Sequence, residues 1–213
     1  MVSVVGILVF DEVEVLDACG PFEVFSVCNR MSERRRPGSI PFEVVTVAHG
    51  PEQEVVMRGG LRLLASHTLA EAPACDVVVV PGGVTDAVER DPAVLDWLRR
   101  ARGRAEVLAS VCTGAFVLAE AGVLHGRVTT HWEDAAALAE RFAGLDVVTD
   151  TRFVDQGDTA TSAGVSAGID LSLHLVERYA GPELALATAR QMDYPWRPGL
   201  GEVVPPRAGE GLI

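Results

Sequence analysis

Short apolar runs alternate along this chain with longer segments whose apolar residues recur at helical spacing. Residues 3–10 and 76–80 are almost entirely apolar and rich in valine, which is typical of strands buried on both faces of a parallel sheet. Residues 14–28 carry apolar side chains close to helical spacing, and Pro21 is expected to kink or to begin that helix. The alternation predicts an α/β domain with a mostly parallel sheet.

The remaining elements follow from the same patterns and from the turn residues between them. Strands are predicted at residues 42–48, 105–110, 127–131, 146–150 and 152–161, with a small hairpin over 55–65. Helices are predicted at residues 86–102, with a break at Asp91-Pro92, and at 113–122, 133–142, 165–178 and 182–192. Residues 31–41, which contain three consecutive arginines, are predicted to form an exposed loop. Residues 1–192 are predicted to form the domain, and residues 193–213 a Pro- and Gly-rich tail.

The composition excludes several classes of protein. Hydrophobic residues make up 48% of the 213 residues, which is enough for a full core. All 18 basic residues are arginine, which excludes Schiff-base lysines, pyridoxal-phosphate chemistry and a lysine-bearing phosphate loop. The formal net charge of −12 argues against nucleic acid as a partner. No apolar run approaches the roughly 20 residues of a membrane span, so no membrane association is expected.

The four cysteines include no C-x-x-C pair and are too few for a disulfide scaffold in a chain of this length. A reduced, cytoplasmic protein is therefore expected, and no metal or other cofactor is predicted. One cysteine, Cys112, lies where a strand is predicted to run directly into a helix. Its small neighbours Ser110, Thr113 and Gly114 permit a tight turn that lifts its side chain out of the sheet.

Cys112 is the candidate nucleophile because of this position. The positive end of the following helix is expected to lower the pKa of the thiol and to favour the thiolate. The alternative is a buried cysteine that packs as a small hydrophobic side chain. Gly82 and Gly83, which end the strand at residues 76–80, allow their backbone N–H groups to form an anion hole with that of Thr113, although two glycines also suit a simple tight turn.

His131 and Trp132 follow another predicted strand. A histidine at this place is expected to reach Cys112 and to serve as its base or its charge partner, unless backbone groups alone satisfy the ring. Trp132 is expected to line the wall of the pocket rather than to act chemically.

Asp17 lies in an apolar setting at the start of the helical run after the first strand. One interpretation is a helix cap. The other is a carboxyl group that points into the pocket, where burial raises its pKa and lets it give or take a proton. Glu14 and Glu23 are alternative carboxylates in the same segment.

Four segments carry a resemblance to a known family. They are LDACGPFEVF, VVVVPGG, SVCTGAFVLAEAGVLHGRVTTHW and TSAGVSAGIDLSLHLVERY, in this order within residues 1–192. In this combination the chain resembles the DJ-1/PfpI superfamily, the class I glutamine-amidotransferase-like group. Two branches fit best: the isonitrile hydratases and the amidase-like N-terminal domain of AraC-type regulators. The resemblance implies a flavodoxin-like three-layer α/β sandwich, a cysteine nucleophile elbow and a homodimer.

The resemblance also implies roles for individual residues. Cys112 corresponds to the elbow nucleophile, and Asp17 and Thr113 to the residues that isonitrile hydratases carry in LD-x-x-GP and after the cysteine. Gly20 of the same segment is taken as a pocket residue, and His131 matches a histidine that lies near the cysteine in several relatives. Other members place histidine directly after the cysteine, so Thr113 argues against peptidase activity.

These observations favour a cysteine-dependent hydratase or lyase that acts on a small-molecule substrate. The leading hypothesis is hydration of an isonitrile to an N-substituted formamide through a thioimidate on Cys112. One alternative is a ligand-sensing domain related to the AraC-type regulators, without their DNA-binding module, since about twenty residues after residue 192 are too few for it. Another is a glyoxalase-like or other enzyme, or a redox sensor, that uses the same cysteine.

Overall fold

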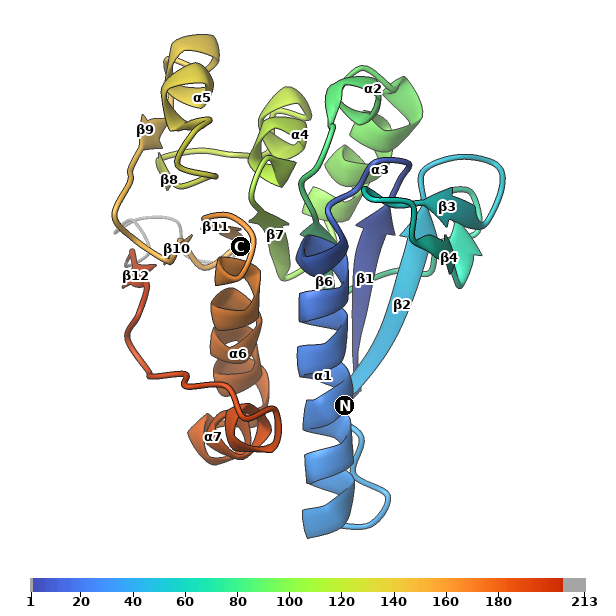
Figure 1. The fold of residues 1–213 in the computed structure, drawn as a ribbon, viewed down its shortest axis with the longest axis vertical. Helices are drawn as coiled ribbons and strands as arrows, with labels where there is room; N and C mark the ends of the chain where they lie inside the picture. The colour runs from blue at the N-terminus through green and yellow to red at the C-terminus, as the bar shows by residue number, and fades with distance from the viewer. Residues whose placement is uncertain (1, 205–213) are drawn as a thin grey trace.

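A computed structural model describes residues 2–204 and contains an eight-stranded sheet with helices on both faces (Figure 1). The strands are, in spatial order, β12 (Glu202–Val203), β10 (Phe153–Asp155), β11 (Thr159–Ser162), β7 (Val107–Val111), β6 (Val77–Val80), β1 (Ser3–Val9), β2 (Phe42–Ala48) and β5 (His67–Thr68). The six strands from β11 to β5 are parallel, whereas β10 runs antiparallel to β11. The predicted three-layer α/β fold with a mostly parallel sheet is confirmed.

The helices form the two outer layers. On one face, α1 (Val15–Arg35), α6 (Ala167–Ala180) and α7 (Pro182–Gln191) pack against one another, and α1 and α6 stand in front of the sheet in Figure 1. On the other face lie α3 (Pro92–Arg102) and α4 (Gly114–Glu120), with the short α2 (Asp86–Glu89) beside them. The predicted break between α2 and α3 is present, and the side chain of Asp91 caps α3 by accepting a hydrogen bond from the Ala93 N–H.

The remaining elements lie outside the main sheet. β3 (Glu54–Val56) and β4 (Arg62–Leu64) form the predicted hairpin. β8 (Arg127–Val128) and β9 (Asp146–Val147) form a separate parallel pair and are shorter than predicted. Together with α5 (Ala135–Arg141) they make a small unit beside α4, at the upper left of Figure 1.

The central strands are apolar because helices cover both faces of the sheet. All four residues of β6 are buried, and β7 is buried along its whole length. Neither strand therefore alternates between polar and apolar positions, and this is why residues 77–80 and 107–109 are all apolar.

The predicted loop over residues 31–41 is wrong for its first half. Helix α1 passes through Pro21 without beginning there and continues to Arg35. Hydrogen bonds to other elements hold its last turns in place. The Asn29 side chain bonds both backbone groups of Phe42, and Arg34 donates a hydrogen bond to Gln191 of α7. The arginines of this stretch also suit the negative end of the helix dipole.

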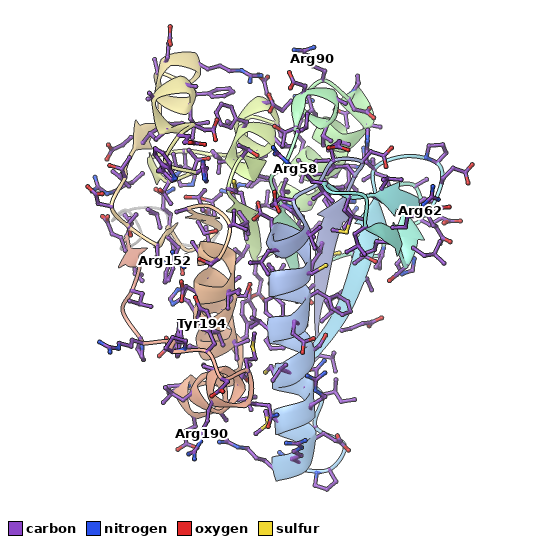
Figure 2. All side chains as sticks on the ribbon, viewed as in Figure 1. Arg58, Arg62, Arg90, Arg152, Arg190 and Tyr194 are labelled. Atoms are coloured by element: carbon purple, nitrogen blue, oxygen red, sulfur yellow. The ribbon has the colours of Figure 1, made fainter. Side chains whose placement is uncertain are left out.

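The segment after α7 returns to the sheet. Trp196 is buried, and β12 adds a short strand beside β10 at the edge of the sheet. Tyr194 donates a hydrogen bond to the buried carboxylate of Asp170, which Arg152 also holds, and Figure 2 places Tyr194 and Arg152 on this side of the molecule. Residues 205–213 of the predicted tail lie outside the described residues.

The order of the strands creates a switch point in the middle of the sheet. From β1 the chain crosses through α1 to β2 on one side, whereas β6 lies on the other side of β1. In open α/β sheets, ligands bind at the carboxyl ends of the strands beside such a point.

Candidate active site

The carboxyl ends of four neighbouring strands bring the residues of the candidate site together. Asp17 lies in the first turn of α1, after β1, and Gly82 follows β6. Cys112 follows β7, and Gly164 follows β11. Because β1, β6, β7 and β11 are adjacent and parallel, these segments meet at one edge of the sheet.

Cys112 occupies the predicted tight turn between β7 and α4. Its φ is 56°, in the left-handed region that residues other than glycine rarely adopt. Its N–H donates to the Ser162 carbonyl of β11 at 3.2 Å, and its own carbonyl accepts a hydrogen bond from the Thr130 hydroxyl at 2.8 Å. Contacts to both neighbouring segments therefore fix the strained backbone at the position of the thiol.

The predicted lowering of the Cys112 pKa is wrong. The pKa of this thiol is raised to about 12, first by burial and then by the negative charge of Asp17, while the backbone N–H and hydroxyl of Thr113 act in the opposite direction. Burial and nearby carboxylates outweigh the end of a helix as short as α4. At neutral pH the thiol therefore keeps its proton until a reaction removes it.

Asp17 is fully buried and faces the same space. Its Oδ2 accepts a hydrogen bond from the Gly82 N–H at 3.0 Å, and its Oδ1 has no hydrogen-bond partner among residues 2–204. Burial raises the pKa of Asp17 to about 7, although the Gly82 N–H and the Cys112 thiol lower it. The side chain does not cap α1. The other interpretation fits Asp17: a carboxyl group in the site that can hold or release a proton near neutral pH. Glu23 instead pairs with Arg30 on the surface.

Gly82 and Gly83 connect the part of the site that carries Asp17 to the part that carries Thr113. The Gly83 N–H donates to the Thr113 hydroxyl at 2.9 Å, and that hydroxyl lies 3.1 Å from the Gly83 carbonyl oxygen. The Gly82 N–H is already bonded to Asp17. A Cβ at Gly82 would lie 2.6 Å from the Thr113 nitrogen, so only glycine fits there. Both glycine N–H groups of the predicted anion hole are thus bonded within the site, to Asp17 and to Thr113, and the N–H of Thr113 lowers the pKa of the Cys112 thiol.

His131 lies beside Cys112, with Gly164 between them. A Cβ built on Gly164 would lie 2.1 Å from Cδ2 of His131 and 3.2 Å from Sγ of Cys112. The other side of the ring faces a carboxylate, because Nδ1 of His131 lies 3.3 Å from Oδ2 of Asp134. The ring therefore lies beside the thiol, and the carboxylate nearest to it is that of Asp134.

Trp132 and Gly20 differ from their predicted places in the pocket. Trp132 is 73% exposed and projects from the surface, with its ring centroid 5.7 Å from that of His131. Gly20 lies in α1 against α6, where a Cβ would contact Ile169 at 3.2 Å. Gly20 therefore serves the packing of two helices, and Trp132 stands at the rim of the site.

Sequence reasoning missed two residues of this site, Asp134 and Gly164. The signal for Asp134 was its spacing of three residues from His131, which suits contact across one turn. Gly164 gave no local signal beyond a run of small residues, because its close neighbours come from the turn after β7 and from the β8–α5 connection.

Within residues 2–204, no group of three or more histidine, cysteine or acidic side chains is arranged to hold a metal ion. In the same part of the chain, no helix is both long enough and apolar enough to cross a membrane.

The family model that matches this chain is that of the DJ-1/PfpI family, and it matches residues 3–178. The chain belongs to the DJ-1/PfpI family. Among curated members, the isonitrile hydratase of Pseudomonas putida is 32% identical over 211 residues, which are 98% of this chain and 86% of that protein.

Transcriptional regulators also match this DJ-1/PfpI protein. The HTH-type regulator CdhR of Pseudomonas aeruginosa is 32% identical over 163 residues, 76% of this chain but 47% of the regulator. The regulator GbdR of the same species is 31% identical and matches over 89% of this chain and 50% of its own length. The chain thus spans about half of the length of these regulators.

Solved structures of the family have the same fold. A THiJ/PfpI family protein from Pseudomonas syringae superimposes with a TM-score of 0.80 at 27% identity, over 93% of this chain and 78% of that one. Drosophila melanogaster DJ-1beta gives a TM-score of 0.78 at 20% identity, over 92% of this chain and all of its own, which is a likeness in fold.

Proposed function

We propose that this protein is a cysteine-dependent hydratase that adds water to an isonitrile and releases an N-substituted formamide. The observation that carries the proposal is the pairing of Asp17 with Cys112. A buried carboxyl group whose pKa is about 7 faces a thiol that keeps its proton. Isonitrile hydration requires one group that bonds the terminal carbon and another that moves a proton to it. The identity with isonitrile hydratase over nearly the whole chain supports the same reaction.

In the first step, the sulfur of Cys112 bonds the terminal carbon of the isonitrile as the S–H bond breaks. Asp17 receives that proton and delivers it to the same carbon, so one S–C and one C–H bond form and the product is a thioimidate. No proton is gained or lost overall. The N–H of Thr113 faces the sulfur and stabilises negative charge on it as the proton leaves.

In the second step, water attacks the thioimidate carbon and its proton is passed to the nitrogen. Breakage of the C–S bond then releases the N-substituted formamide, and the sulfur recovers a proton. Asp17 carries the proton between water and nitrogen, because its pKa lies near neutral pH. His131, held by Asp134, is placed to orient the attacking water beside the thiol.

We propose further that the substrate is uncharged and carries an apolar substituent. Leu16, Val84 and Trp132 are all exposed, and each is a direct neighbour in sequence of Asp17, Gly83 or His131. Large apolar side chains at the mouth of a site favour a carbon-rich ligand. This agrees with an isonitrile, whose reactive group is small and neutral.

The test is a screen of aliphatic and aromatic isonitriles, nitriles, amides and 2-oxoaldehydes, with formamide or acid release followed by mass spectrometry. We expect turnover of isonitriles by the wild type and its complete loss in Cys112→Ala. Cys28→Ala is the matched control, because Cys28 is a buried cysteine of α1 whose thiol pKa is also raised. Turnover by Cys112→Ala at the wild-type rate contradicts the mechanism, and turnover of 2-oxoaldehydes alone supports a glyoxalase-like enzyme instead.

A second candidate is a domain that senses a small molecule without converting it. It is favoured by the matches to CdhR and GbdR, which span most of this chain. Calorimetry with the same compounds separates the two functions: saturable binding of an isonitrile or amide with no product after long incubation supports the sensor.

We also propose, from membership of the family, that the protein acts as a homodimer in the cytoplasm. Sedimentation equilibrium at micromolar concentration tests the dimer, since a mass near 22.6 kDa would be that of the monomer.

A further inference from the structure

The segment that carries His131 is joined to the rest of the site directly by Thr130, whose hydroxyl binds the Cys112 carbonyl, and through α5 by Arg141. His131 lies four residues before the start of α5, and Asp134, whose carboxylate is 3.3 Å from Nδ1 of His131, is the N-cap residue of that helix. The position of α5 therefore decides where Asp134 stands and how the His131 ring is turned. The last residue of the same helix is Arg141.

Arg141 binds two carboxylates that belong to two other helices. Its Nη1 lies 2.6 Å from Oε2 of Glu89 in α2, and its Nη2 pairs with Oε1 of Glu120 at the end of α4. The guanidinium group also stacks over Phe116 and Phe142, with 5.8 and 5.3 Å to the ring centroids. One side chain thus links α5 to both helices that face it.

Glu89 extends this link to the glycine segment of the site. It is only 7% exposed, and its second carboxylate oxygen accepts a hydrogen bond from the hydroxyl of Thr85, which is itself buried. Thr85 stands two residues after Gly83, whose N–H binds the Thr113 hydroxyl. Polar contacts therefore run from Arg141 through Glu89 to Thr85, and the backbone of residues 83–85 joins Thr85 to the Gly83–Thr113 hydrogen bond beside the nucleophile turn.

Stability alone is a poor explanation of this ion pair, in which the Glu89 side chain is 7% exposed and the Arg141 side chain is 42% exposed. Burial of the Glu89 carboxylate costs much of what its attraction to the half-exposed Arg141 returns, so an apolar contact of similar volume would stabilise the fold as well. An apolar contact has no directional bonds. The two Nη groups of the guanidinium, by contrast, bind two carboxylates and hold α5 in one orientation against α2 and α4. A small displacement of a catalytic group is costly to a reaction that depends on geometry.

We propose that Arg141 is a positioning residue: through Glu89 and Thr85 it fixes α5, and with it His131 and Asp134, against the Gly82-Gly83 wall of the site. This inference rests on the proposed function only for its effect on turnover. The effect of Arg141 on the position of α5 can be tested without a substrate.

The variants separate positioning from stability. Arg141→Met removes the charge and leaves buried Glu89 without its cation, so it lowers both the melting temperature and kcat. The double variant Glu89→Gln/Arg141→Met leaves no unpaired charge at this buried position, and the introduced glutamine keeps an oxygen for the Thr85 hydroxyl. We expect the double variant to recover most of the melting temperature while kcat stays roughly 10- to 100-fold low and KM changes little. Arg141→Lys keeps the charge but cannot bind both carboxylates in the same geometry. Its kcat should therefore lie between those of Arg141→Met and the wild type.

The matched control is Arg90→Met. Arg90 is an exposed arginine of the α2 region, labelled at the top of Figure 2, and it pairs with Asp86 one helical turn away. Its loss should leave kcat and the melting temperature close to those of the wild type.

Hydrogen–deuterium exchange of residues 127–142 provides the readout without turnover. Exchange should be several-fold faster in Arg141→Met and in the double variant than in the wild type and Arg90→Met. Unchanged exchange, or recovery of kcat together with the melting temperature in the double variant, overturns the proposal. Faster exchange in a protein that turns over none of the isonitriles would support the positioning role and reject the proposed function.

Discussion

Two buried aspartates at different ends of the sheet have opposite electrostatic environments. Asp17 at the candidate site accepts one hydrogen bond, and its other oxygen has no partner among the described residues. Asp155, at the far end of β10, lies 2.8 Å from Nε2 of His174, accepts the Gly157 N–H at 2.7 Å and has Arg178 at 3.5 Å. Burial raises the pKa of both, but the partners of Asp155 bring its pKa below the ordinary value, whereas that of Asp17 rises to about 7.

The difference teaches that burial alone does not set the charge of a carboxyl group. The number of donors that face it decides whether it stays ionised. The donors around Asp155 compensate the charge of its carboxylate, so this residue stabilises the fold. Asp17 is left short of partners beside a nucleophile, which is costly for stability and useful for proton transfer.

The largest expected effect that separates the two residues is the loss of activity in Asp17→Asn. Asparagine keeps an oxygen for the Gly82 N–H but cannot accept or deliver the proton. We expect kcat/KM for an isonitrile to fall by about 10²- to 10⁴-fold at pH 7. A variant that retains the wild-type kcat/KM would remove Asp17 from the mechanism.

The same substitution should change how stability depends on pH. Between pH 4 and 7 the folded wild type keeps a proton on Asp17 that the unfolded chain has lost, so its stability falls as the pH rises through this window. The loss amounts to at most about 4 kcal/mol. Urea denaturation at pH 5 and pH 8 should therefore show a smaller decrease for Asp17→Asn, and an equal decrease would contradict the raised pKa.

The next largest effect is the loss of stability in Asp155→Asn. Without this charge, His174 and Arg178 lose the carboxylate between them, and we expect a cost of about 3 kcal/mol at pH 7. The sign with pH is opposite to that of Asp17. Because the pKa of folded Asp155 is lowered, its contribution is present above the ordinary pKa of aspartate and is lost as the pH falls.

Activity provides the control for Asp155→Asn. Under conditions where the variant is folded, as checked by circular dichroism, kcat should stay close to that of the wild type. A large fall in kcat with full folding would mean that the two ends of the sheet are coupled, and the contrast between the two aspartates would fail.

A smaller effect is expected for Gly164→Ala, because the added methyl group crowds only the candidate active site and not the surroundings of Asp155. The added Cβ would meet the His131 ring at 2.1 Å, so the ring or the backbone must move away from the thiol. We expect destabilisation of about 1–3 kcal/mol and a fall in kcat. Gly144→Ala is the control, because a Cβ there meets nothing within 4 Å in the described part of the chain. Equal behaviour of the two variants would remove the steric argument for Gly164.

The sequence was sufficient for those features that depend on local pattern. The apolar runs located β1, β6 and β7, and the residues after each strand located Asp17, Gly82 and Cys112. Asp134 and Gly164 were not found because their role depends on contacts between segments far apart in the chain. The pKa of Cys112 was predicted in the wrong direction for the same reason: a helix end is visible in sequence, whereas burial and the approach of Asp17 are tertiary. The arginines at residues 34–36 indicated a loop, but packing of α1 against α7 extended the helix through the first two.

The smallest expected effect concerns Trp132, which tests whether the rim of the site takes part in binding. Its side chain is 73% exposed, so Trp132→Ala should change stability by no more than about 0.5 kcal/mol. An exposed tryptophan beside His131 contributes to function only through what it contacts in the complex. We therefore expect KM for aromatic isonitriles to rise while kcat and the KM for small aliphatic isonitriles stay near those of the wild type. Leu64→Ala is the control, because Leu64 is equally exposed on the β3–β4 hairpin, and a similar rise in KM there would show that surface hydrophobicity in general, rather than this rim, determines the effect.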